Sequence, residues 1–164
     1  MSVFLDKSNK IKAININKIL RKVLSDKVIQ ETILDFNRKD QLFLKGEDAE
    51  GVKLGDKSGG YSPTTIQLSI EEKGSAVFNY KGASSTKTVG GSPILFNDGD
   101  FYDTFKINIG SNYFTITANP IKDNNNLFDD FGANIVGLQQ ESKNKLTDLI
   151  KDVFISTIKR EATK

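Results

Sequence analysis

The sequence contains no cysteine and no histidine. Without cysteine the chain has no disulfide, no thiolate nucleophile and no Cys-ligated zinc or iron–sulfur site. Without histidine it lacks the commonest general base and the commonest metal ligand, which excludes histidine-dependent triads and zinc hydrolases. Any catalysis would have to use Asp, Glu, Lys, Ser, Thr or Tyr. Tryptophan is also absent, which argues modestly against a sugar-stacking site.

Long apolar runs are missing as well. The stretch from Met1 to Leu5 is ended by Asp6 and Lys7, well short of a signal peptide or a membrane span. We therefore expect a protein that is made and used in the cytosol, without membrane contact. A length of 164 residues is that of one ordinary domain with a core of its own, so we predict a single domain over residues 1–164.

Charge is nearly balanced, with a formal net charge of +2, which is too small to imply nucleic-acid binding by itself. Its distribution is uneven, because residues 1–30 hold seven Lys or Arg against two Asp. A solvated helix face explains this pattern, and contact with phosphate or with an acidic partner is the alternative.

Two amphipathic helices are expected near the ends of the chain. After a short strand at Ile11 to Ile14, Asn15 or Asn17 can cap a helix whose apolar residues recur with a period near 3.6 as far as about Asn37. The final helix is expected from about Gln139 to Lys159. Its apolar side comprises Leu146, Leu149, Ile150, Val153, Phe154 and Ile158.

Between these helices, residues 46–60 have five glycines and little to bury, which predicts a flexible loop. Ser62 is a good N-cap and Pro63 suits the first helical position, so a short helix should run to about Glu72. Residues 76–80 alternate as a strand does, and residues 84–92 read as a loop.

The clearest hairpin joins residues 105–109 to residues 113–117 around Gly110, Ser111 and Asn112. Residues 123–126 predict a turn, and residues 127–131 a single helical turn. The fold class is therefore α+β: a small antiparallel sheet with a β-hairpin, packed against the long N-terminal and C-terminal helices.

No motif for binding a cofactor or a metal is complete in this sequence. The glycines at 46 and 51 are spaced as in a phosphate-binding loop, but Val52 stands where lysine is required. A calcium loop starting at Asp123 would place Phe128 at the obligatory glycine. Asp98, Asp100 and Asp103 could gather around Mg²⁺, although acids on a turn are more often solvated. We therefore predict no catalytic residue, no cofactor and no metal site.

The most informative segment runs from Leu95 to Phe105. Gly99 follows two turn-forming residues, and Phe101 and Phe105 are expected as buried anchors of the adjacent sheet, with Thr104 beside them. An ordinary junction between a loop and a strand would also explain these residues locally.

Four short motifs follow one another in a recognisable order. They are an aromatic-x-Pro helix start, a Leu-x-Asn-x-Gly-x-Phe-x-x-Thr-Phe segment, a Phe-Gly pair, and a Gly-Leu pair before the last helix. Their residues are Tyr61, Pro63, Leu95, Asn97, Gly99, Phe101, Thr104, Phe105, Phe128, Phe131, Gly132, Gly137 and Leu138. In this order the chain resembles the bacteriophage virion-morphogenesis, or tail-completion, family. The Pro-x-Arg that usually precedes Gly-Leu in that family is replaced here by residues 133–136.

The resemblance implies a non-enzymatic component of the virion, made in the bacterial host cytoplasm. Such a protein forms a homo-oligomeric ring at the phage neck and contacts neighbouring neck, tail or head–tail connector proteins. Non-specific contact with DNA in the channel is a further expectation. The alternative function is a soluble accessory protein that binds a partner or nucleic acid through its basic N-terminal helix.

Overall fold

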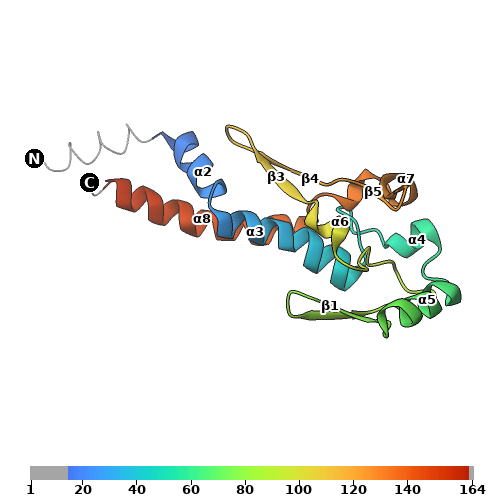
Figure 1. Cartoon of the computed structure of the whole chain (residues 1–164). Coiled ribbons are helices and arrows are strands. Elements are labelled where there is room, and N and C mark those ends of the chain that lie inside the picture. Colours follow the sequence, from blue (N-terminus) through green and yellow to red (C-terminus); the bar gives the residue numbers. More distant parts are fainter. Residues whose placement is uncertain (1–14, 163–164) are drawn as a thin grey trace, which may run out of the picture.

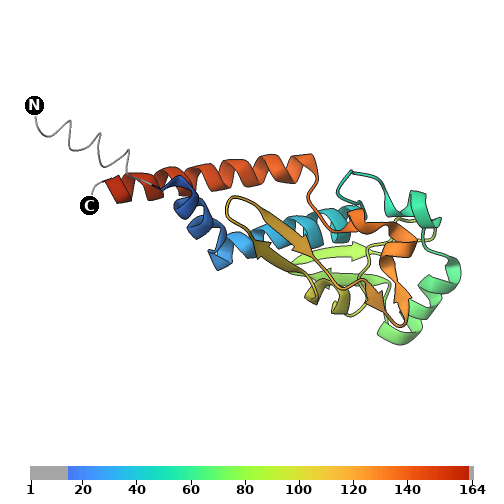
Figure 2. The same ribbon diagram turned by 90° about the horizontal axis from the view of Figure 1, so that it is seen from above.

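The computed structural model describes residues 15–162, and it confirms an α+β fold built from helices and antiparallel two-stranded ladders. The strand predicted at Ile11 to Ile14 lies outside the described residues. Figures 1 and 2 show an elongated molecule, in which a helical arm extends from a body of short helices and strands.

The N-terminal helical region is interrupted rather than continuous. Helix α2 spans Ile16–Leu24 and begins at Asn15, as predicted, and helix α3 spans Lys27–Asp35. Asp26 separates them: its backbone is extended, and its carboxylate accepts hydrogen bonds from the first turn of α3. The prediction of one unbroken helix to about Asn37 is therefore wrong.

The helical path also continues further than predicted. A π-helix, η1, spans Phe36–Lys45 and buries Leu42 and Phe43 completely. Gly46 ends it in the left-handed conformation, at φ 60°, which a glycine adopts without steric cost. A π-helix of this length is unusual, and π-turns are frequently found at functional sites.

Residues 46–60 form a folded segment, so the expectation that they have little to bury is wrong. Helix α4 spans Leu54–Ser58, and the side chains of Leu54 and Asp48 are fully buried. Glu47 pairs with Lys53 in an isolated antiparallel bridge. The glycines had suggested a flexible loop, but tertiary contacts anchor it at these few positions.

Helix α5 spans Pro63–Lys73 and starts at Ser62, whose side chain accepts the Thr65 amide at 3.1 Å, as the sequence predicts. Strand β1, Val77–Tyr80, pairs with β2, Ala83–Thr86, so part of the loop expected at residues 84–92 is a strand. Lys81 and Gly82 both have positive φ, and this geometry allows a two-residue turn.

The hairpin, the helical turn at residues 127–131 and the final helix follow the sequence predictions, whereas the short elements at residues 100–103, 121–122, 125–126 and 133–135 were not predicted. Helix α6, Asp100–Asp103, precedes the predicted hairpin of β3, Lys106–Ile109, and β4, Phe114–Thr117. Strands β5, Ile121–Lys122, and β6, Asn125–Asn126, pair around the predicted turn. Three further elements complete the described chain: α7, Leu127–Phe131; the 3₁₀ helix η2, Ala133–Ile135; and α8, Gln140–Ala162.

Two hydrophobic clusters hold these elements together. The first lies in the body, where the Phe96 ring packs edge-on against the rings of Phe43 and Tyr102. The second fills the arm and joins α2, α3 and α8 to one face of the β3–β4 hairpin. Ile107 contributes to both clusters, so the hairpin links the body to the arm (Figure 2).

Candidate functional site

The first sequence motif, at Tyr61 and Pro63, forms a junction between α5 and the segment before the central motif. The Tyr61 amide donates to the Gly91 carbonyl at 3.0 Å, and its phenol oxygen accepts the Ile94 amide at 2.9 Å. Burial raises the pKa of Tyr61 to about 12, although the Ile94 hydrogen bond opposes that rise. Tyr61 is therefore a neutral structural group at physiological pH.

The central motif is a chain reversal followed by two buried aromatic anchors, as predicted. Leu95 and Gly99 both have positive φ, 51° and 98°, and Gly99 precedes the single turn of α6. Phe101 and Phe105 are buried with their ring centroids 5.1 Å apart. Thr104 holds the end of α6 in place, because its hydroxyl accepts the Asn119 amide at 3.0 Å.

The Phe-Gly motif closes the same core. Phe131 is buried in the first cluster, to which Leu95 and Tyr61 also belong as partly buried members. Gly132 has φ 81°, a conformation that other residues rarely adopt. The Phe131 carbonyl accepts a hydrogen bond of 2.9 Å from the Lys57 ammonium, which connects this motif to the folded 46–60 segment.

The Gly-Leu motif is held by two buried amide side chains of η1. Asn37 donates to the Ile135 carbonyl at 3.1 Å and accepts the Gly137 amide at 2.9 Å. Gln41 donates to the Gly137 carbonyl at 2.9 Å and accepts the Gln139 amide at 2.8 Å. Four backbone groups around Gly137 thus find partners in the interior, and Leu138 then enters the second cluster.

A second polar junction surrounds Asp48. Its carboxylate accepts the amides of Glu50 and Val52, both at 2.9 Å, and the Lys57 ammonium at 2.6 Å. Burial alone raises the pKa of Asp48, but the hydrogen bonds from Lys57 and the two amides outweigh it and place the pKa below its usual value. Gln139 adds a bond to the Asp48 carbonyl at 2.9 Å.

These junctions contain the residues that the sequence reasoning missed. Asn37, Gln41 and Asp48 are fully buried, and each is connected to chain more than 70 residues away, either directly or through Lys57. A signal was present for two of them, since Leu34, Asn37 and Gln41 continue the helical stripe at spacings of three and four residues. Polar side chains on an apolar stripe indicate buried hydrogen bonding.

The acidic residues of the central motif do not converge. Asp98 is paired with Lys122 at 2.6 Å, and this hydrogen bond lowers its pKa. Asp100 and Asp103 lie on the exposed side of α6. Over residues 15–162 no group of three or more acidic side chains is arranged to hold a metal ion.

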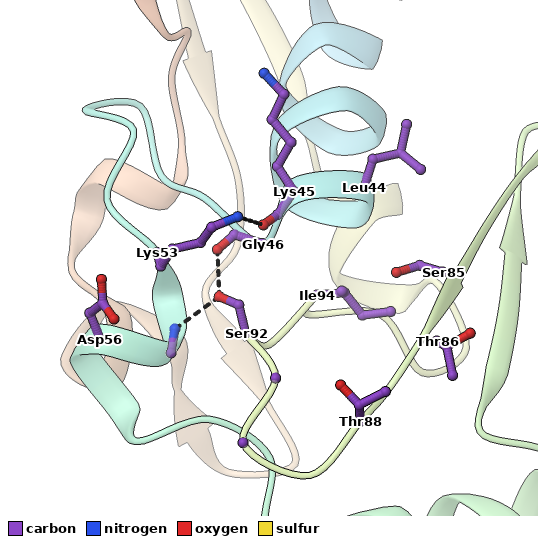
Figure 3. A pocket seen from close by; sticks show the side chains of 13 residues that line it. Leu44, Lys45, Gly46, Lys53, Asp56, Ser85, Thr86, Thr88, Ser92 and Ile94 are labelled. Atoms are coloured by element: carbon purple, nitrogen blue, oxygen red, sulfur yellow. Dashed lines mark hydrogen bonds between the residues drawn. The ribbon is translucent and has the colours of Figure 1, made fainter.

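At least three hollows are lined by residues that the structure describes. The most polar has a volume of about 430 Å³ and lies between the end of η1, α4 and residues 85–94 (Figure 3). In it Ser92 donates to the Gly46 carbonyl at 2.7 Å and accepts the Gly55 amide at 2.9 Å, so its hydroxyl is already satisfied. A second hollow, of about 490 Å³, is apolar and separates the β3–β4 hairpin from α8. The third, of about 330 Å³, is lined by Tyr61, Leu95 and Phe131.

Comparisons of the chain with protein-family models, curated proteins and solved structures find no match. Among the helices within residues 15–162, none is long and apolar enough to cross a bilayer. The geometry of the chain is therefore the basis for the functional proposal below.

Proposed function

We propose that this chain is a structural, non-enzymatic subunit of a phage or prophage neck, a tail-completion or head–tail joining protein that assembles into a ring around the DNA channel. The observation that carries the proposal is the surface of α5. This helix of 11 residues buries one side chain, Ser69, and leaves Leu68 and Ile70 about half exposed, at 49% and 47%.

The exposed face of α5 matters because a short helix normally needs to bury an apolar face to be stable. Isolated helices shorter than about 12–15 residues are marginal in water, and most helices are stabilised by burying an apolar face. Within its own subunit α5 buries very little, so a surface on a neighbouring subunit is the natural partner for Leu68 and Ile70.

A ring needs two different surfaces on each subunit, because its contacts are heterologous. The β3–β4 hairpin points away from α5 and toward the helical arm (Figures 1 and 2), and Tyr113 near its tip is 60% exposed. We propose that α5 of one subunit meets the hairpin end of the next copy.

The resemblance to the tail-completion family also supports the proposal, because residues of its motifs pack together in the core. Tyr61, Leu95, Phe101 and Phe131 are separated by up to 70 residues in sequence and meet in one hydrophobic cluster. Three of the four motifs thus meet in one hydrophobic cluster, while Leu138 of the fourth lies in the second cluster.

The first test is the mass of the purified protein, measured by light scattering during size-exclusion chromatography, with negative-stain imaging of the same fractions. We expect rings for the natural sequence and monomers for Leu68→Glu combined with Ile70→Glu. Thr64→Glu is the matched control, because it adds a charge to the exposed first turn of α5, where the helix dipole favours it. A natural chain that stays monomeric at high concentration would contradict the proposal.

The second test is genetic. Deleting the gene should leave DNA-filled heads and separate tails, or heads that leak, in electron micrographs. Normal virions together with loss of an enzymatic step would contradict the proposal and return attention to Asp98, Asp100 and Asp103.

The alternative, a nucleic-acid-binding accessory protein, is favoured by one observation on α2. Lys18, Arg21 and Lys22 are exposed, while Ile19 and Val23 of the same helix are buried. If this function is correct, a monomer should retain DNA, and the logarithm of its affinity should fall with the logarithm of salt concentration by about 0.9 per phosphate contacted. Ring formation without such retention favours the structural role.

A further inference from the structure

Lys87 is a buried cation in the wall of the smallest of the three hollows. It follows β2, and its side chain lies over the Phe78 ring, with the ammonium 4.2 Å from the ring centroid. The residue is 7% exposed, whereas lysine is almost never so buried without a partner.

The partners that Lys87 has within its own chain are weak. Its ammonium carries three donors, and its one hydrogen bond to a described residue reaches Asn97 Oδ1 at 3.5 Å, the outer limit for such a bond. No described carboxylate forms an ion pair with it within 4 Å, and the nearby Asp98 is paired with Lys122. Cation–π contacts with Phe78 and, at 5.5 Å, with Tyr61 offset only part of the cost of burying the charge.

The hollow beside Lys87 is of a size for a small group. It has a volume of about 330 Å³, near the lower end for ligand sites. Apolar walls come from Leu95, Phe96, Leu127 and Phe131, and Lys122 lies at the same hollow. The site therefore combines an apolar wall with one under-partnered positive charge.

We propose that this hollow binds a carboxylate borne on a short apolar group, with Lys87 as the counter-ion. A carboxylate matches the single available ammonium and would accept two of its unused donors. A phosphate dianion would bring twice the charge, and Lys122 is already engaged by Asp98. The apolar part of the ligand would lie against Leu95 and Phe131.

Two sources of such a carboxylate exist: a free organic acid, or an acidic side chain or chain end of a neighbouring subunit. The second rests on the proposed ring, while the first does not. An experiment on the natural full-length chain separates them.

The probe is hexanoate, and hexanamide serves as its uncharged analogue. Lysine side-chain NMR follows the Lys87 Nζ and Cε resonances while each compound is added. We expect a saturable shift of Lys87 with hexanoate, an upward change in the pKa of Lys87 at saturation, and binding at least about tenfold weaker for hexanamide.

Two variants identify the group responsible. Lys87→Met keeps the length and apolar character of the side chain and should weaken hexanoate binding at least about tenfold, a loss of about 1.4 kcal/mol. Lys106→Met removes an exposed lysine on β3 and should leave binding unchanged. If Lys87→Met fails to fold, the Lys87 resonance of the natural chain still decides the question.

Light scattering of the same samples identifies the source of the carboxylate. Hexanoate that lowers the mass of the assembly indicates that a neighbouring subunit supplies the carboxylate, whereas binding without loss of mass indicates a free acid. The proposal is overturned if the Lys87 resonances do not shift saturably with hexanoate, or if hexanamide and hexanoate bind equally well.

Discussion

Replacing Asp48 tests whether residues 46–60 are a folded element. Asp48→Ala removes a fully buried carboxylate and leaves the amides of Glu50 and Val52 without their acceptor. The Lys57 ammonium loses its carboxylate partner and keeps its hydrogen bond to the Phe131 carbonyl. Removing one partner of a buried pair costs about 3–5 kcal/mol, and the Lys57 side chain is 26% exposed, so water compensates part of this loss. We expect a destabilisation of about 3 kcal/mol.

Asp48→Asn separates charge from hydrogen bonding, because the amide oxygen can still accept from the two backbone amides. It should cost about 1–2 kcal/mol. A double-mutant cycle with Lys57→Met should give a coupling free energy of similar size. Asp56→Ala is the control, since Asp56 is exposed in the same segment, and it should cost no more than about 0.5 kcal/mol.

Urea unfolding followed by circular dichroism measures these differences, and thermal unfolding gives a second reading. For a chain of this length about 3 kcal/mol corresponds to a fall in Tm of about 6–12 °C. Because the folded pKa of Asp48 is lowered, its contribution is fully present above the unfolded pKa, near 3.8, and is lost as the pH falls through the folded value. Asp48→Asn should remove that part of the acid sensitivity.

Limited trypsin digestion provides the local readout. The folded segment should resist cleavage after Lys53 and Lys57 in the natural chain and become sensitive in Asp48→Ala. Equal stability of the Asp48→Ala and Asp56→Ala variants, or rapid cleavage of the natural chain in this segment, would refute the reasoning and restore the flexible loop expected from the glycines.

Further predictions concern the core, a buried charge and the projecting hairpin. Phe101→Ala and Phe105→Ala should each cost about 3–5 kcal/mol in urea unfolding, while Asp100→Ala should do little; the opposite order would favour a metal site. Burial, followed by repulsion from Lys122, lowers the pKa of Lys87, so its destabilising effect is greatest below the folded pKa and fades as the pH rises toward 10.5. The stability of the natural chain relative to Lys87→Met should therefore increase as the pH rises toward 10.5, and a constant difference would contradict this. Tyr113→Ser should lower the assembly mass in light scattering without a change in Tm, because Tyr113 is exposed.

The sequence by itself determined the elements whose signals are local. Ser62 and Pro63 start α5 through a cap and a fixed φ, and Asn15 starts α2 through a side-chain cap. Alternating residues around Gly110 produce the β3–β4 hairpin, and a helical period produces α8. Each of these depends on groups within a few residues of one another, which is why spacing alone predicts them.

Only the tertiary structure decided that residues 46–60 are ordered and which groups the polar side chains of η1 bind. Five glycines predict flexibility, but the buried Asp48 carboxylate holds the segment together locally. Leu54 and Lys57 then anchor it to distant parts of the chain, through the first hydrophobic cluster and the Phe131 carbonyl. The positions of Asn37 and Gln41 on the helical stripe indicate burial, but their partners, the backbone groups near Gly137, lie about 100 residues later. Burial of Lys87 has the same origin, since the aromatic rings beside it come from separate elements. Such partners are distant in sequence and close only after folding, so no local pattern specifies them.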